Sequence, residues 1–339
     1  MMRPWLFFKG IKMKKTAPFK LAIAPKLTFF NSQLSDLNML RMQVNRSKGL
    51  ATYLAQSQKA QRSLTALNST LSIMSFSIYM VRLMNNLSLL ALMLSEEEQK
   101  SRKLRGTLYL NLFNDSLWSI VNLTQCFWLS FRNSKAAGLQ GMQLEVIAQL
   151  IDLLVMLIRY QQEKEEYELK YMQANSIERN HLQMDRFYKE MHFIRSILTS
   201  LSIVTVISVF AFSVASVSIS PIISPIILLN SLSKLFIDNE KEKYLLHQMS
   251  YRLTEEQLLN KERALRRKYF TALNQIILYN VLLPIGLFTL IITPIPLAIL
   301  ISLSMLLTHL LTQRLIEAHY KPIANENNEG IDIESRLTV

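Results

Sequence analysis

Ionisable side chains inside apolar segments are the residues of this sequence that could do chemistry. Three segments, 71–94, 107–131 and 143–160, are mostly apolar yet carry charged residues. An ionisable group at bilayer depth is costly, so it usually faces a protein interior or a water-filled cavity, where it can relay protons or ions. The candidates in these three segments are Arg82, Asp115, Glu145 and Asp152. His309, in the later apolar segment 271–313, is a further candidate.

Polar residues in these segments recur at helical spacing. The two stripes, with steps of three, four or seven residues, are Asn111, Asp115, Asn122 and Gln125, and Glu145, Gln149 and Asp152. Such steps place each stripe on one helix face. The stripes predict polar faces that pack together or meet water, or else a polar path across the bilayer. Arg82 is a potential partner of Asp115 or Asp152, and for His309 we expect a helix-packing hydrogen bond.

Motifs of catalysis and cofactor binding are absent from the sequence. Gly138 and Gly141 lack the spacing and the following Lys-Ser/Thr of a phosphate-binding loop. The five histidines form no HxxxH or HExxH pattern, and Cys126 is the only cysteine. We therefore predict that the chain is not an enzyme and binds no metal or other cofactor.

Two uncharged blocks, 196–233 and 271–313, are the strongest structural signal. Each is long enough for two bilayer-spanning helices, which need roughly 17–25 residues. Prolines interrupt each block near its middle, and a proline cannot continue a helix without losing a hydrogen bond. We predict two hairpins, 196–219 with 222–237 and 272–292 with 297–313; a single kinked helix or a re-entrant loop in each block is the alternative.

Together with only seven glycines, these blocks predict an all-α, multi-pass helical membrane protein. If 107–131 and 143–160 form a third hairpin, the chain has six spans, or seven if 71–94 also inserts. The lipid bilayer is then its first partner, and we predict an integral location in a membrane.

Two charged stretches, 161–195 and 238–270, show an internal repeat at an offset of 77 residues. The ten identical pairs are Glu163/Glu240, Lys164/Lys241, Glu165/Glu242, Tyr167/Tyr244, Leu169/Leu246, Met172/Met249, Glu178/Glu255, Leu182/Leu259, Arg186/Arg263 and Phe193/Phe270. Self-similarity at a fixed period indicates duplicated structural units.

Because neither charged stretch contains glycine or proline, we expect each to form one long helix, about 50 Å in length at 1.5 Å per residue. Met184, Phe187, Met191 and Ile194 follow the three- and four-residue steps of a coiled-coil seam. We expect the two helices to pack side by side as an antiparallel or stalk-like bundle, and the alternative is a pair of solvated helices along the membrane surface. They are predicted to bind protein partners or to self-associate.

Charge and hydropathy divide the chain into seven segments. They are a basic segment 1–62, weakly apolar helices 63–160, a charged helix 161–195, a membrane hairpin 196–237, a second charged helix 238–270, a second hairpin 271–313 and a polar, acidic tail 314–339. Residues 1–62 contain most of the formal charge of +13. Beside long apolar spans, this basic segment indicates the cytoplasmic face of a membrane and not a nucleic-acid partner. Hairpins that cross and return predict both charged stretches on one face.

The acidic tail carries Glu326, Glu329, Asp332 and Glu334. Residues 325–336 resemble the polar, acid-bearing C-terminal signals of effectors injected by bacterial type IV secretion systems, a class that includes multi-span proteins with coiled-coil segments. The resemblance implies a protein that enters a host-cell or vacuole membrane and acts there through its exposed helices. It implies no catalytic residues.

Three functions remain open on the sequence. The leading hypothesis is a membrane-embedded interaction or scaffold protein. The second is a small transporter or channel that uses the polar residues of the N-terminal spans, and the third is a hairpin protein that shapes membranes.

Overall fold

The computed structural model describes residues 17–55, 58–93, 106, 109–121, 124, 135–212 and 220–321, and these residues form helices and short turns without any strand. The elements are α1 (Ala17–Ala55), α2 (Gln58–Met93), α4 (Lys135–Gln173), α5 (Ser176–Phe212), α6 (Ser220–Met249), the 3-10 turn η1 (Ser250–Arg252), α7 (Glu255–Ile277), the π-helical turn η2 (Leu278–Leu282), α8 (Leu283–Ile292) and α9 (Ile295–His319). A further helix covers residues 109–121. The predicted all-α class is confirmed for this part of the chain.

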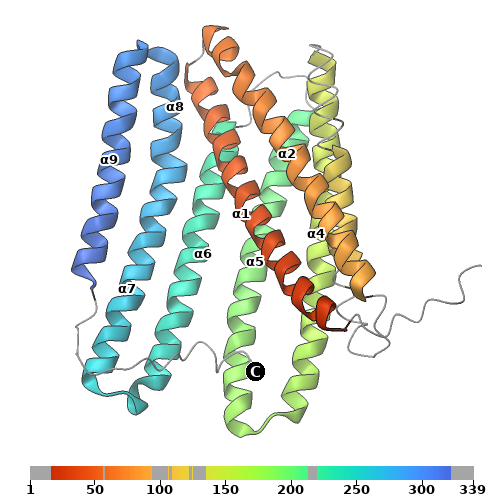
Figure 1. Cartoon of the computed structure of the whole chain (residues 1–339), viewed down its shortest axis with the longest axis vertical. Coiled ribbons are helices and arrows are strands. Elements are labelled where there is room, and N and C mark those ends of the chain that lie inside the picture. The colour runs from red at the N-terminus through yellow and green to blue at the C-terminus, as the bar shows by residue number, and fades with distance from the viewer. Residues whose placement is uncertain are drawn as a thin grey trace, which may run out of the picture.

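The helices from α4 onward run up and down in chain order (Figure 1). Helix α4 packs on α5, α5 on α6, α6 on α7, and α8 on α9, while η2 joins α7 and α8 into one column. Helix α1 runs obliquely across this row and packs on α2, α6 and α8 (Figure 1). The sequence assigned no element to the basic segment 1–62, whose described part lies mostly in the 39-residue helix α1.

Five of the described helical segments are long and apolar enough to cross a membrane. They are Ser69–Leu92, Glu178–Phe212, Pro221–Met249, Glu255–Ile292 and Ile295–His319. The segment 71–94, whose insertion the sequence left open, falls in the first of them. The predicted segment 143–160 is not among the five, and the predicted segment 107–131 lies partly outside the described residues.

The proline-bearing turn of the second hairpin lies where the sequence predicted it. Helix α8 ends at Ile292 and α9 begins at Ile295, with Pro294 in an extended conformation between them. Pro284, which lacks an N–H donor, lies in the first turn of α8, directly after the wider turn of η2. In the first hairpin α5 and α6 pack together, and α6 begins at Ser220 with Pro225 inside the helix.

The prediction of one unbroken helix for each charged stretch is wrong. Residues 174–175 separate α4 from α5, and η1 with residues 253–254 separates α6 from α7. Each stretch is therefore a pair of antiparallel arms, 161–173 with 176–195 and 238–249 with 255–270. The charged parts of these helices are called the charged arms below.

Helix caps explain both breaks. The Asn175 side chain accepts a hydrogen bond from the Glu178 N–H at 2.9 Å, and the Glu178 carboxylate accepts one from the Asn175 N–H at 3.1 Å. Thr254 and Gln257 form the same reciprocal arrangement at the start of α7. Such capping boxes begin a new helix without requiring glycine or proline, which is why the absence of those two residues was misleading.

The two capped turns lie at the same end of the row of helices, and the α8–α9 turn lies at the opposite end (Figure 1). Helices α5 and α6, and the column of α7, η2 and α8, are thus charged at the capped end and apolar toward the other. The caps are 79 positions apart and not 77, because η1 precedes the second cap. The internal duplication stays a prediction.

Candidate functional site

A buried ion pair joins α2 to the helix of residues 109–121. The Arg82 guanidinium lies 3.2 Å from the Asp115 carboxylate, and the side chains are 24% and 1% exposed. Asn86 donates a second hydrogen bond to Asp115. Arg82 also lies over the ring of Tyr79, 5.7 Å from its centroid. Of the two partners that the sequence offered for Arg82, the structure therefore pairs it with Asp115.

Asparagine side chains extend this pair to α1. Asn31 donates to Asn86 Oδ1 at 2.8 Å, and Asn85 donates both to Asn31 Oδ1 at 2.7 Å and to the Leu27 carbonyl at 2.8 Å. A second bridge between the same helices runs from Asn38 Nδ2 to the Tyr79 hydroxyl at 3.2 Å. Buried amides held this way fix the relative position of two helices, because any shift would leave donors unpaired.

Asp152 of α4 is also held by the helix of residues 109–121. Trp118 Nε1 donates to Asp152 at 3.0 Å, and the Trp118 ring stacks on Tyr79 with centroids 6.2 Å apart. Arg159 of α4 donates to Asn111 at 2.5 Å, and its charge acts on both Asp115 and Asp152. Asp115 and Asp152 thus share one cation on α4 in addition to their own hydrogen-bond donors.

Glu145 lies nearer the start of α4, and the charges of Arg41 and Arg46 on α1 act on it. The four helices therefore hold three acids, Asp115, Glu145 and Asp152, and each acid has a basic residue from another helix or from its own helix nearby. Together with the asparagine bridges, we call these residues the N-terminal polar network. Asn122 and Gln125, which the sequence assigned to the first stripe, lie outside the described residues.

His309 lies apart from this network. It is on α9, which packs on α7 and α8 at the far edge of the row (Figure 1). Its carbonyl accepts a hydrogen bond from Asn274 Nδ2 at 3.3 Å, and its ring Nδ1 has no hydrogen-bond partner. His309 thus bonds another helix through its backbone carbonyl, and the helix-packing hydrogen bond expected of its side chain stays a prediction.

Several members of the network were missed on the sequence. Arg159 follows Asp152 by seven residues, a step that keeps both on one helix face, so extending the α4 stripe would have found it. Arg41 and Arg46 were counted only as part of a basic segment, because no helix was assigned there. Tyr79 and Trp118 are indistinguishable on the sequence from aromatic residues that face lipid.

Chemically, the network offers charge balance across four helices. A buried acid is tolerated when a base and hydrogen-bond donors surround it. Removing one partner from such a set destabilises a protein by far more than the intact set stabilises it. This is the behaviour of a packing seam. A proton or ion path needs groups that can change partners along a continuous hydrated route, whereas here Arg82, Asn86 and Trp118 each hold an acid directly.

Ion pairs also join the charged arms to one another. Lys241 of α6 pairs with Asp185 of α5 at 2.7 Å, and Asp238 of α6 lies 3.0 Å from His192 of α5. Lys268 of α7 pairs with Glu242 of α6. The arms of α5, α6 and α7 therefore form one connected surface.

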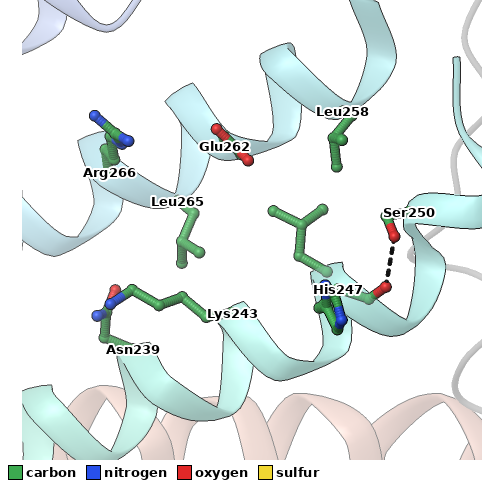
Figure 2. A pocket seen from close by; sticks show the side chains of 9 residues that line it. Asn239, Lys243, His247, Ser250, Leu258, Glu262, Leu265 and Arg266 are labelled. Carbon is green, nitrogen blue, oxygen red and sulfur yellow. Dashed lines mark hydrogen bonds between the residues drawn. The ribbon is translucent and has the colours of Figure 1, made fainter. Parts of the chain in front are cut away.

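Two grooves of about 320 Å³ lie between paired arms. One lies between α4 and α5, where Arg186 covers the ring of Tyr167 at 4.6 Å. The other lies between α6 and α7 and mixes leucines with Lys243, Glu262 and Arg266 (Figure 2). Leu258 and Leu265 of α7 extend toward α6 across the space between the two helices (Figure 2).

The described residues contain no group of three or more His, Cys, Asp or Glu side chains placed to hold a metal ion. No protein-family model, curated protein or solved structure matches the chain.

Proposed function

We propose that the chain is a multi-pass integral membrane protein that serves as a scaffold. Its apolar helix halves anchor it in the bilayer, its N-terminal polar network locks the helices together, and its charged arms receive protein partners or a second copy outside the membrane. The observation that carries the proposal is the segregation of α5, of α6 and of the column of α7, η2 and α8 into an apolar and a charged half, with both capped turns at one end (Figure 1).

Exposure of the apolar halves supports the membrane part of the proposal. In the most apolar 18-residue stretch of each of the five candidate spans, only 6% to 33% of the residues are buried inside the protein. On α9, Leu300 and Leu303 are 62% and 57% exposed. Burying one such side chain is worth about 1.5–3 kcal/mol, and soluble monomers rarely expose continuous apolar surfaces of this kind. Lipid is the environment that satisfies these faces.

Exposed apolar side chains among the charged arms support the partner-binding part. Phe187 of the predicted seam is 51% exposed, and Leu169 and Met172 of α4 are 63% and 75% exposed. The seam is therefore not covered by the other charged stretch. An apolar stripe flanked by charged residues is the surface that another amphipathic helix recognises.

The alternatives have less support. A transporter that uses the network would require Asp115 and Asp152 to release partners that hold them at hydrogen-bond distance. A membrane-shaping hairpin was suggested by short second arms, yet α6 and α9 contain 30 and 25 residues, enough for a full crossing.

The resemblance of residues 325–336 to type IV effector signals bears on where the scaffold would act, and these residues lie outside the described part of the chain. Under this proposal a host-cell or vacuole membrane is the site of action. Fusion of a translocation reporter, with and without the tail, tests that extension separately from the scaffold itself.

Two measurements test the scaffold proposal. Alkaline carbonate should leave the full chain in the membrane pellet and detergent should release it; recovery in the carbonate supernatant would refute integration. With the chain in its native membrane, a photo-reactive residue in place of Phe187 should then form cross-links outside the bilayer, either to a second copy or to a discrete partner. The same residue in place of Glu165, outside the seam, is the control. Equal or absent cross-linking at both positions would refute docking on the seam.

A further inference from the structure

The groove between α5 and α6 lies where the charged arms meet the apolar halves. Its volume is about 660 Å³. Its walls are mainly apolar and include Met191, Ile194 and Leu198 of α5 and Leu229, Phe236 and Ile237 of α6. All of these except Ile237 are exposed to the surroundings of the protein. The groove is therefore open toward the region that the proposed function assigns to lipid.

Among the described residues, Arg195 is the only charged one that lines this groove. Its guanidinium donates to the Asn230 side chain and carbonyl and, at 3.2 Å, to the Ser196 hydroxyl, and its Nε has no partner. Within the described residues no carboxylate lies at ion-pair distance from it. An arginine that hydrogen-bonds only neutral groups in an apolar setting retains a charge that an anion could neutralise.

The surroundings of Arg195 carry a net positive charge. Lys234 and Arg195 both act on His192, and Asp238 is the acid whose charge acts on Arg195. Asp238 is itself engaged by His192 at 3.0 Å. The acid nearest in charge to Arg195 is thus already engaged by His192, and the guanidinium remains available to an anionic ligand in the groove.

We propose that this groove binds an anionic phospholipid, with its phosphate on the Arg195 guanidinium and an acyl chain along the apolar walls toward Leu198 and Leu229. The inference rests on the proposed membrane location. A guanidinium presents a planar set of donors that matches phosphate oxygens, and lipid-binding pockets between helices combine apolar walls with basic residues at headgroup level. A free phosphate would use only the arginine and would gain nothing from the walls.

The neighbouring groove between α6 and α7 provides a contrast. It contains Lys243 and Arg266, but Glu262 lies in the same lining and opposes an anion (Figure 2). Arg266→Gln therefore serves as a matched control, because it removes the same charge from the same end of the molecule without touching the α5–α6 groove.

The experiment measures lipid binding to the full chain in neutral detergent micelles by native mass spectrometry and by titration. The probes are phosphatidylglycerol, phosphatidylcholine and inorganic phosphate. We expect saturable binding of phosphatidylglycerol, weakened about tenfold or more in Arg195→Gln and nearly unchanged in Arg266→Gln. Arg195→Lys should lie between the wild type and Arg195→Gln, because it keeps the charge and loses the planar set of donors.

A second variant guards against misfolding of the arginine variants. Ser202→Trp narrows the apolar part of the groove, where the native hydroxyl bonds only the Leu198 carbonyl of its own helix, and it should also weaken phosphatidylglycerol binding. Three results would each overturn the inference. They are phosphatidylcholine binding as tight as phosphatidylglycerol binding, displacement of phosphatidylglycerol by inorganic phosphate, and wild-type affinity for phosphatidylglycerol in both Arg195→Gln and Ser202→Trp. If the chain stays in the membrane pellet after carbonate extraction but does not bind phosphatidylglycerol, only this inference is overturned. If carbonate releases the chain from the membrane, the proposed function itself is overturned.

Discussion

Replacing Arg82 with methionine should destabilise the protein by leaving Asp115 buried without its ion-pair partner. Methionine keeps the length of the arginine stem, so the change removes mainly the charge and the donors. Asp115 is 1% exposed and lies 3.2 Å from Arg82. Removing one partner of a buried pair costs about 3–5 kcal/mol. Because Asn86 still donates to Asp115 and Arg82 is 24% exposed, we expect the lower end of that range.

The double variant Arg82→Met with Asp115→Asn should recover about half of the loss or more, because the amide keeps the hydrogen bond and removes the stranded charge. The assay is unfolding of the purified chain in mixed micelles, followed by circular dichroism as denaturing detergent is increased. Arg314→Met, which removes an exposed arginine of α9, is the control and should stay within about 0.5 kcal/mol of the wild type. A loss below about 1 kcal/mol for Arg82→Met, or no recovery in the double variant, would refute the ion-pair reasoning.

Two further predictions concern the network acids and the capped turns. The variant Asp115→Asn with Asp152→Asn should insert normally and leave proton and cation flux across reconstituted liposomes at the wild-type level; specific wild-type flux that vanishes in the variant would support the transporter instead. Asn175→Ala or Thr254→Ala should each cost about 1 kcal/mol in the same unfolding assay, because each removes the side chain that caps α5 or α7. Ser176→Ala, one residue beyond the first cap, should have no comparable effect, and equal losses in all three would contradict the capping argument.

Much of the membrane architecture could be predicted because lipid imposes long uncharged helices. The turn at Thr293–Pro294 followed directly from the proline rule, and the all-α class from the length of the apolar runs. The charged stretches were mispredicted because a capping box is a weak pattern among many polar residues. Asn175 with Glu178 and Thr254 with Gln257 are ordinary residues for a solvated helix, and only the backbone shows that they begin one.

The candidate site was only partly predictable for a related reason. Helical spacing identified the faces of Asp115 and Asp152, since periodicity acts within one helix. The partners of these acids lie on other helices, and their identity depends on how the helices pack. Arg82 with Asp115 was one of two options, while Trp118 with Asp152 left no trace in the sequence. His309 was grouped with the others by residue type alone, and the structure places it on the opposite flank.

Labelling of the turns from one side of the membrane tests the central claim most directly. In a Cys126→Ser background, single cysteines at Ser176, Ser250 and Thr293 mark the two capped turns and the α8–α9 turn. The structure places the first two at one end of the row and the third at the other (Figure 1). In sealed vesicles an impermeant maleimide should therefore label Ser176→Cys and Ser250→Cys from the same face and Thr293→Cys only from the opposite face. Labelling of Ser176→Cys and Ser250→Cys from different faces would contradict the account, as would labelling of all three from one face.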